Sequence, residues 1–298
     1  MIELSLVSHA KINLGLRIVG KRADGYHLID TIFQEVAFGD ILTFRRSGEA
    51  AGLTLTCTDP RLPLDGANLC VQAFQLLRDR FPEMGGVHLS LEKHIPVGAG
   101  LGGGSSNAAV TLLGLARLFR LPVIPQDLLE MATALGADVP FFLYGGLARG
   151  RGIGERIDPV RQAPGHPVVL VIPDIHVSTA WAYRQLNYGL TNRQSENKLK
   201  GFFENWEDYR RWRNEFEAPV IKRYSEIGEI LQQMHHHQAD FASLSGSGSA
   251  IFGIFPDAAA AEAAADEFAR FYRCVLTRPV IRHRSRMDHL LSLSPISS

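Results

Sequence analysis

The feature that most constrains this chain is a glycine-rich run at residues 98–104, where five of seven residues are glycine. Glycine adopts positive φ without strain and has no side chain to keep a ligand away from the backbone. Two serines and an asparagine at 105–107 then open a segment, 106–119, with apolar residues at helical spacing. The unpaired N–H groups of a helix start therefore lie beside the loop. Such a unit binds phosphate, and it predicts a nucleotide triphosphate as the ligand.

Other interpretations of glycine-rich segments in this chain are weaker. Residues 98–103 also match a dinucleotide-binding fingerprint, but no acidic residue that would hold a ribose follows at 121–125. Residues 15–22 nearly match a Walker A loop, but Arg22 replaces the serine or threonine that would hold Mg²⁺. A tight bend needs only one or two glycines. Phosphate binding by 98–104 is the favoured interpretation.

Composition limits the classes of function. The chain has 298 residues, which favours two domains, and 31 basic residues balance 31 acidic ones. We therefore expect no nucleic-acid partner and no anionic membrane surface as partner. The N-terminus lacks a secretory signal, and no apolar run is long enough to span a bilayer. Three scattered cysteines without a Cys-x-x-Cys pair argue against disulfides and structural zinc, so we expect a cytoplasmic protein.

The order of predicted elements indicates an α+β fold. We expect an N-terminal domain at 1–160, in which strands and helices mix without regular βαβ alternation. We expect a C-terminal domain at 161–298, where strands at 168–172, 250–255 and 274–281 surround an alanine-rich helix, as in a ferredoxin-like sandwich. In the first domain the predicted strands are 2–7, 12–19, 31–37, 41–44, 53–57 and 87–92, and the predicted helices are 68–80, 106–119 and 126–135.

Several polar residues stay ambiguous on spacing alone. Lys11 is typical of an exposed lysine at a strand start, and Asp138 is typical of a turn-capping aspartate. A run of three histidines at 235–237 resembles a metal tract, but adjacent helical positions cannot converge on one ion, so a solvated helix end is favoured. The serine-glycine loop at 245–249 fits a flexible turn, a phosphate contact or a contact to the first domain.

Taken together, residues 11–13, 96–109 and 244–248 resemble the three motifs of the GHMP kinases, a superfamily that includes kinases of galactose, homoserine and mevalonate. Residues 22–27 and 136–140 most resemble one branch of this superfamily, in which the acceptor substrate carries a cytidine diphosphate. The resemblance implies a two-domain GHMP kinase architecture: an N-terminal α+β domain like ribosomal protein S5 and a C-terminal ferredoxin-like α/β sandwich. It also implies ATP and Mg²⁺ as cofactors.

The activity that this resemblance implies is transfer of the ATP γ-phosphoryl group to the 2-hydroxyl of 4-diphosphocytidyl-2-C-methyl-D-erythritol. This reaction belongs to the non-mevalonate route to isoprenoid precursors. Family analogy makes Asp138 the general base and Lys11 its catalytic partner. A carboxylate in reach can take the hydroxyl proton. An ammonium beside it can offset charge that develops on the transferred group.

The same resemblance assigns binding roles. The acceptor is expected to contact Asn13, Tyr26, His27 and Tyr183, with aromatic faces stacked on the cytosine. Asn68 and Lys93 correspond to positions near the adenine, and Ser106 is the expected protein neighbour of Mg²⁺. The phosphate-binding residues are expected to be Pro96, Val97, Gly98, Ala99, Gly100, Leu101, Gly102, Gly103, Gly104, Ser105 and Ser106.

Alternatives remain open at this point. One is another GHMP kinase acting on a small alcohol, as mevalonate and homoserine kinases do. Another is a nucleotide-binding relative that has lost catalysis, against which the presence of both Lys11 and Asp138 argues. A nicotinamide-dependent oxidoreductase is a distant third. The sequence predicts no oligomeric state.

Overall fold

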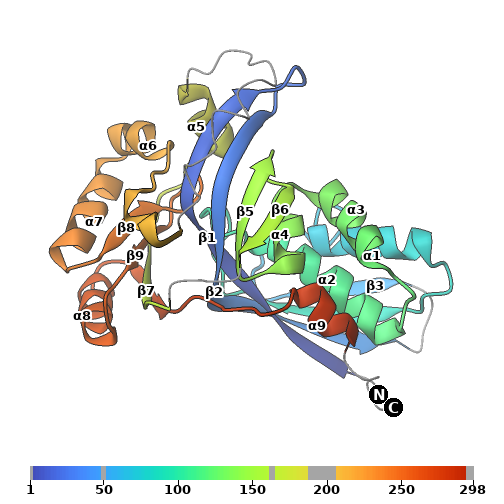
Figure 1. Cartoon of the computed structure of the whole chain (residues 1–298). Helices are drawn as coiled ribbons and strands as arrows, with labels where there is room; N and C mark the ends of the chain where they lie inside the picture. Colours follow the sequence, from blue (N-terminus) through green and yellow to red (C-terminus); the bar gives the residue numbers. More distant parts are fainter. Residues whose placement is uncertain (1–2, 48–51, 161–164, 187–205, 293–298) are drawn as a thin grey trace.

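The computed structural model describes residues 3–47, 52–160, 165–186 and 206–292, arranged as two β-sheets and the helices that cover them (Figure 1). The first sheet has six strands in the order β3-β4-β2-β5-β6, and β1 pairs with β2. Its pairs are antiparallel except for β3 with β4. These strands are β1 (Glu3–Lys21), β2 (His27–Arg46), β3 (Leu53–Cys57), β4 (Val87–Glu92), β5 (Leu147–Gly152) and β6 (Arg156–Val160).

The long hairpin of β1 and β2 is more continuous than the sequence predicts. The two strands expected at 2–7 and 12–19 are one strand, because pairing continues across a register shift just before Ala10. The shift breaks the apolar alternation without ending the ladder. Opposite the shift, a Cβ on Gly39 would lie 2.5 Å from the carbonyl oxygen of Ser8, so this close approach requires glycine.

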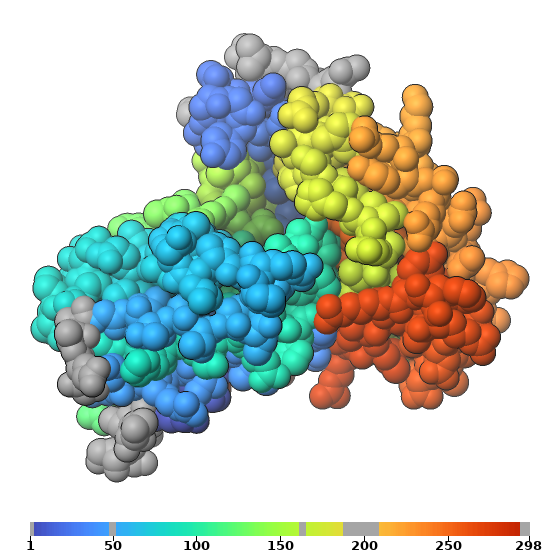
Figure 2. Space-filling model, turned by 180° about the vertical axis from the view of Figure 1, so that it is seen from behind, coloured from blue at the N-terminus to red at the C-terminus, as the bar shows by residue number. Residues whose placement is uncertain are grey.

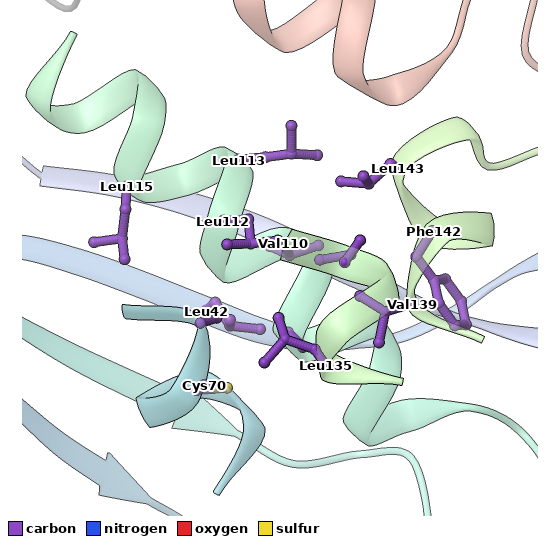
Figure 3. Packing of buried hydrophobic residues seen from close by; sticks show 14 of the residues in the cluster. Leu42, Cys70, Val110, Leu112, Leu113, Leu115, Leu135, Val139, Phe142 and Leu143 are labelled. Carbon is purple, nitrogen blue, oxygen red and sulfur yellow. The ribbon is translucent and has the colours of Figure 1, made fainter. Parts of the chain in front are cut away.

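Four helices cover one face of the first sheet. Side chains from α2 point toward Leu42 of β2 on one side and toward Phe142 and Leu143 of α4 on the other (Figure 3). The middle of α2 is buried almost all round, which fits its apolar composition. The helices are α1 (Leu69–Arg80), α2 (Gly103–Phe119), α3 (Pro125–Leu135) and α4 (Val139–Tyr144).

The second sheet has four antiparallel strands in the order β10-β7-β9-β8. In chain order this is 4-1-3-2, the arrangement of a ferredoxin-like sandwich, so the predicted α+β class is confirmed. Strand β8 extends to Leu244, so the serine-glycine loop begins at Ser245. The elements are β7 (Val168–Ile172), α5 (Thr179–Gln185), a 3-10 helix (Trp206–Arg211), α6 (Glu217–Arg223), α7 (Ser225–His236), β8 (Phe241–Leu244), β9 (Ile251–Ile254), α8 (Ala258–Phe268) and β10 (Arg273–Thr277).

A shared apolar cluster fixes the two sheets against each other. Ile12 and Leu14 of β1 belong to the same cluster of buried residues as Val168 and Leu170 of β7 and Phe252 of β9. Each of these five residues is at most 1% exposed. The hairpin of β1 and β2 therefore forms the joint between the two parts, as the central position of its blue strands shows (Figure 1).

After β10 the chain returns to the first sheet. Ala37 N–H donates to Arg278 O at 2.9 Å, and Val280 N–H donates to Glu35 O at 2.8 Å. The final helix, α9 (Arg286–Ser292), buries Met287 and Leu290 in the core of the first part. The domain boundary at 160 and 161 stays a prediction: the chain changes sheet between Val160 and Val168 but later crosses back.

A buried carboxylate anchors this returning segment. The carboxylate of Glu35 accepts hydrogen bonds from Arg282 at 2.6 and 2.8 Å, from Gly146 N–H at 2.7 Å and from Arg286 at 2.5 Å. His9 Nδ1 lies 2.8 Å from the same carboxylate. Burial alone would raise the pKa of Glu35, but the charge of Arg286 and the bonds from Arg282 and His9 outweigh it and hold the pKa well below its usual range.

Candidate active site

The predicted phosphate loop lies between β4 and α2 and folds as its glycines require. Gly98, Gly100 and Gly102 have φ of +73°, +80° and +70°. A Cβ on Gly100 would lie 2.1 Å from Ser245 O, so no side chain fits there. Helix α2 begins three residues before the predicted start, at Gly103, because Gly102 adopts the left-handed conformation that precedes it. The loop and the helix start line a cavity of about 370 Å³.

Lys11 of β1 and Asp138, the residue just before α4, come together as the resemblance implies. Lys11 Nζ lies 3.5 Å from Asp138 Oδ2 and donates to Asn13 Oδ1 at 2.6 Å. The Lys11 side chain is 5% exposed, whereas that of Asp138 is 33% exposed. Burial lowers the pKa of Lys11, and the charge and hydrogen bond of Asp138 oppose that shift only in part.

Asn13 is held in the orientation that presents its oxygen to Lys11. Its Nδ2 donates to Thr31 Oγ1 at 2.8 Å, and Thr31 in turn donates to Gly15 O at 2.7 Å. The amide cannot rotate without losing the bond to Thr31, so the acceptor stays directed at the ammonium. Phe33 lies beneath the same ammonium, with its ring centre 5.4 Å from Nζ.

The serine-glycine loop after β8 lies against the first part of the molecule. Ser245 Oγ donates to Gly100 O at 2.9 Å, and Ala250 N–H donates to Ala99 O at 3.0 Å. A Cβ on Gly246 would be 3.6 Å from Lys11 Nζ. Among the three interpretations left open by the sequence, the structure shows the contact to the first domain.

A larger cavity of about 750 Å³ opens on the other side of the lysine. Its lining includes Lys11, Asn13 and Asp138 together with Tyr26, His27 and Tyr183, so it gathers the predicted catalytic and acceptor-binding residues. Figure 2 shows the face on which the N-terminal part, in blue to green, meets the C-terminal part, in yellow to red, with a recess between them. The two cavities share Gly100 and Gly102 in their linings.

The aromatic residues of the larger cavity are partly paired already. The rings of His27 and Tyr183 stack with centres 4.6 Å apart and planes 17° from parallel, while Phe216 meets Tyr183 edge-on. Tyr26 is 60% exposed at the rim. Burial raises the pKa of Tyr183 to about 12. The pKa of His27 is lowered, mainly by burial and also by the charge of Lys21. The phenol and the imidazole are therefore both neutral at pH 7.

The predicted adenine contacts line the smaller cavity but also have structural bonds. Asn68 caps α1, accepting from Cys70 N–H at 2.9 Å and donating to Pro63 O at 2.8 Å. Lys93 pairs with the buried carboxylate of Asp40. A Cβ on Gly103 would lie 3.3 Å from Lys93 Nζ, so this ammonium sits at the start of α2. Contact with a nucleotide stays a prediction for both residues.

Ser106, the predicted metal neighbour, is fully buried and accepts a hydrogen bond from Ser8 at 2.7 Å. It is not in the lining of either cavity, whereas Ser105 lines the smaller one. Among the described residues no group of three or more His, Cys, Asp or Glu could hold a metal ion. The structure thus gives the Ser106 prediction no geometric support, and the role stays a prediction.

Sequence reasoning missed several residues at this site. Lys21 and Arg184 line the larger cavity, and Asn214 bonds the serine-glycine loop, yet nothing in their local pattern marks them. Arg184 is separated from Lys21 by most of the chain, so only the fold brings the two together.

None of the helices in the described ranges is long and apolar enough to cross a bilayer.

Comparison with known proteins places both halves of the chain in one class. Residues 68–146 match the GHMP kinases N terminal domain, and residues 190–274 match the GHMP kinases C terminal domain. The first of these ranges contains the phosphate loop and Asp138, and the second contains the whole serine-glycine loop. Two of the three motifs in the sequence therefore lie inside the matched ranges, and residues 11–13 lie outside them.

Relatives define a narrower group. The chain is 42% identical to a 4-diphosphocytidyl-2-C-methyl-D-erythritol kinase of Prosthecochloris aestuarii, covering 93% of this chain and 98% of that one. It is also 42% identical to the enzyme of that name from Chlorobium phaeobacteroides strain BS1, covering 94% and 98%. A crystal structure of 4-(cytidine 5'-diphospho)-2C-methyl-D-erythritol kinase superposes with a TM-score of 0.78 at 34% identity, covering 93% of this chain and 99% of that one.

The chain therefore belongs to the GHMP kinases, and within them to the family of 4-diphosphocytidyl-2-C-methyl-D-erythritol kinases. More distant structures share the fold alone. A homoserine kinase from Cytophaga hutchinsonii superposes with a TM-score of 0.70 at 18% identity, covering 95% of this chain and 96% of that one.

Proposed function

We propose that this protein transfers the γ-phosphoryl group of ATP to the 2-hydroxyl of 4-diphosphocytidyl-2-C-methyl-D-erythritol, a step toward isoprenoid precursors. The observation that carries the proposal is the meeting of two cavities at Gly100 and Gly102, with Lys11 and Asp138 beside that junction. A phosphate donor in the smaller cavity and an alcohol in the larger one would face each other there. Phosphoryl transfer depends mainly on such alignment and on charge stabilisation.

The smaller cavity fits the triphosphate of ATP. Its loop turns through three glycines at positive φ, and it ends at the start of a helix of 17 residues, where free N–H groups and the helix dipole favour anions. The ammonium of Lys93 also lies at that point, although Asp40 balances its charge. We assign the phosphates to residues 96–105 and the adenine end to the neighbourhood of Asn68. Mg²⁺ would neutralise phosphate charge, but the described residues offer it no carboxylate cluster.

The proton of the acceptor hydroxyl passes to Asp138 in this proposal. The carboxylate is partly exposed to the larger cavity, so a bound alcohol can reach it. Lys11 stays within 3.5 Å and stabilises charge as it moves from the carboxylate to the transferred group. Asn13 keeps the ammonium in place through its 2.6 Å bond. General-base catalysis of this kind contributes about 10²–10⁴-fold.

The cytidine end of the acceptor is assigned to the aromatic residues of the larger cavity. The exposed ring of Tyr26 can cover a base face, and the neutral His27 offers one donor and one acceptor to its edge. Tyr183 presents a flat ring that already stacks on His27. Base binding between Tyr26 and Tyr183 requires His27 to leave that stack, which is a concrete expectation for a complex.

The function is tested by incubating the protein with ATP and 4-diphosphocytidyl-2-C-methyl-D-erythritol and measuring ADP. We expect one ADP for each phosphorylated product, and no ADP above background with mevalonate or homoserine. Asp138→Asn should lower kcat by about 10²–10⁴-fold, because the proton acceptor is lost. Asp158→Asn, a change in an exposed surface pair with Arg151, is the matched control and should leave kcat unchanged.

Two outcomes would contradict the proposal. Turnover of a small alcohol, with indifference to the cytidyl compound, would assign a different substrate to the larger cavity. Near-normal kcat in the Asp138→Asn variant would remove the general-base role, whatever the substrate.

A further inference from the structure

The serine-glycine loop at 245–249, together with Leu244 before it, touches both halves of the reaction centre. Its Gly246 lies beside Lys11 and Asn13, because a Cβ there would be in van der Waals contact with their polar atoms, at 3.6 and 3.5 Å. Its Ser245 bonds the carbonyl of Gly100, where the two cavities meet. The position of this loop therefore limits where the lysine and the phosphate loop can lie relative to each other.

One buried side chain, that of Asn214, holds the backbone of this loop in place. Asn214 is 3% exposed, and its Nδ2 donates to Leu244 O and to Gly246 O, both at 2.7 Å. Its Oδ1 accepts from Phe216 N–H at 3.0 Å. Both amide hydrogens are used on backbone carbonyls of the loop, so the side chain acts as a fixed clamp.

The backbone around Asn214 is fixed to the strand that carries Lys11. Leu16 N–H donates to Arg213 O, and Glu215 N–H donates to Leu16 O, each at 3.0 Å. Ile18 N–H donates to the Glu215 carboxylate at 2.8 Å. The side chain of Asn214 thus connects β1, five residues beyond Lys11, with the loop that lies beside that lysine.

We propose that Asn214 is a positioning residue for phosphoryl transfer, which holds the serine-glycine loop in register with Lys11 and the phosphate loop. The inference rests on the proposed function for its kinetic consequence. Asn214 does not line either of the two cavities, so it acts through the loop rather than on a ligand. Small misplacements of reacting groups cost large factors in rate, so loss of the clamp should act on kcat.

The first test is kinetic. Asn214→Asp keeps the size and the oxygen that accepts from Phe216, but it removes the two donors and turns a carboxylate toward two carbonyls. We expect kcat to fall by about 10–100-fold while the KM values for ATP and acceptor stay within about threefold. Asn214→Ser, uncharged and smaller, covers the case in which the aspartate variant fails to fold.

The matched control is Glu217→Gln. Glu217 is a partly buried neighbour that bonds Ser243 and Leu244 N–H through one oxygen, and glutamine keeps an acceptor there. We expect its kcat to stay within about twofold of the original. A double-mutant cycle with Lys11→Met completes the test, because the Asn214 effect on kcat should largely vanish once the lysine is gone. Full additivity of the two changes would show a merely structural role and overturn the inference.

A second readout does not depend on the substrate. Acylation of Lys11, followed by peptide mass spectrometry on the folded protein, should be several-fold faster in the Asn214→Asp and Asn214→Ser variants than in Glu217→Gln. An unchanged Lys11 labelling rate in both Asn214 variants would overturn the inference. Faster labelling together with no transfer to the cytidyl compound by the unaltered protein would instead retain the clamp and reject the proposed substrate.

Discussion

Lys11 and Glu35 face each other in the register of the β1–β2 hairpin, yet their surroundings differ sharply. Glu35 is bonded by two arginines, a histidine and a backbone N–H, and its pKa falls despite complete burial. Lys11 has one carboxylate at 3.5 Å, and burial lowers its pKa. A charge with all its bonding positions filled holds the fold together. A charge with few partners remains available for chemistry.

The largest expected effect comes from removing the charge of Glu35 from its cluster of bonded partners. Glu35→Gln should reduce the free energy of unfolding by about 3–5 kcal/mol, because Arg282 and the buried Arg286 lose their counter-charge. Activity per folded molecule should stay near normal, since no member of the cluster lines the larger cavity. Urea denaturation and active-site titration measure the two quantities. Equal losses of stability and kcat would show that the Glu35 cluster also serves the reaction.

The same substitution tests how the free energy of unfolding depends on pH in the acid range. The pKa of Glu35 lies below its ordinary value of 4.5 in the folded state, so the unfolded chain binds the proton first as pH falls. The stabilisation is therefore complete above about pH 4.5 and is lost as pH falls through the folded pKa. Glu35→Gln should flatten this part of the stability profile. A profile unchanged in slope would contradict the cluster's role.

Lys11→Met should have the opposite effect, a large loss of kcat with little change in stability. We expect kcat to fall by about 10²–10³-fold, since a preorganised cation beside the reacting groups is removed. Stability should change little, because burial already disfavours the ammonium and the partly exposed Asp138 keeps its water. Kinetics and a thermal melt on the same sample measure both. A large drop in Tm with unchanged kcat would make Lys11 a structural residue like Glu35.

The smallest effect is expected at the acceptor end. Tyr183→Ala should raise the KM of the cytidyl substrate by about 5–10-fold, the value of one aromatic pair, and leave the KM of ATP unchanged. Tyr224→Ala is the matched control, because Tyr224 packs on Trp181 and is not in the lining of the larger cavity. Steady-state kinetics with each substrate varied in turn decide between them. Equal KM changes for both substrates would argue against a base-stacking role.

The parts of the molecule that sequence predicts well are those built from neighbours along the chain. The glycine run and helix α2 lie within 25 residues, and three of the five glycines adopt the positive φ that their residue type allows. The Glu35 cluster could not be found in this way, because Arg282 and Arg286 are 247 and 251 positions away. The Lys11–Asp138 pair was reached only through family resemblance, since neither residue has a distinctive local pattern.

The return of the chain to its first sheet has a consequence for dissecting the protein. Fragments divided at residue 160 would not be self-sufficient, since Met287 and Leu290 fill the core of the opposite piece. Coexpressed halves should instead reassemble into a functional pair, with α9 of the C-terminal fragment completing the core of the N-terminal fragment. Split-protein reporters cut at this site would therefore register reassociation rather than independent folding.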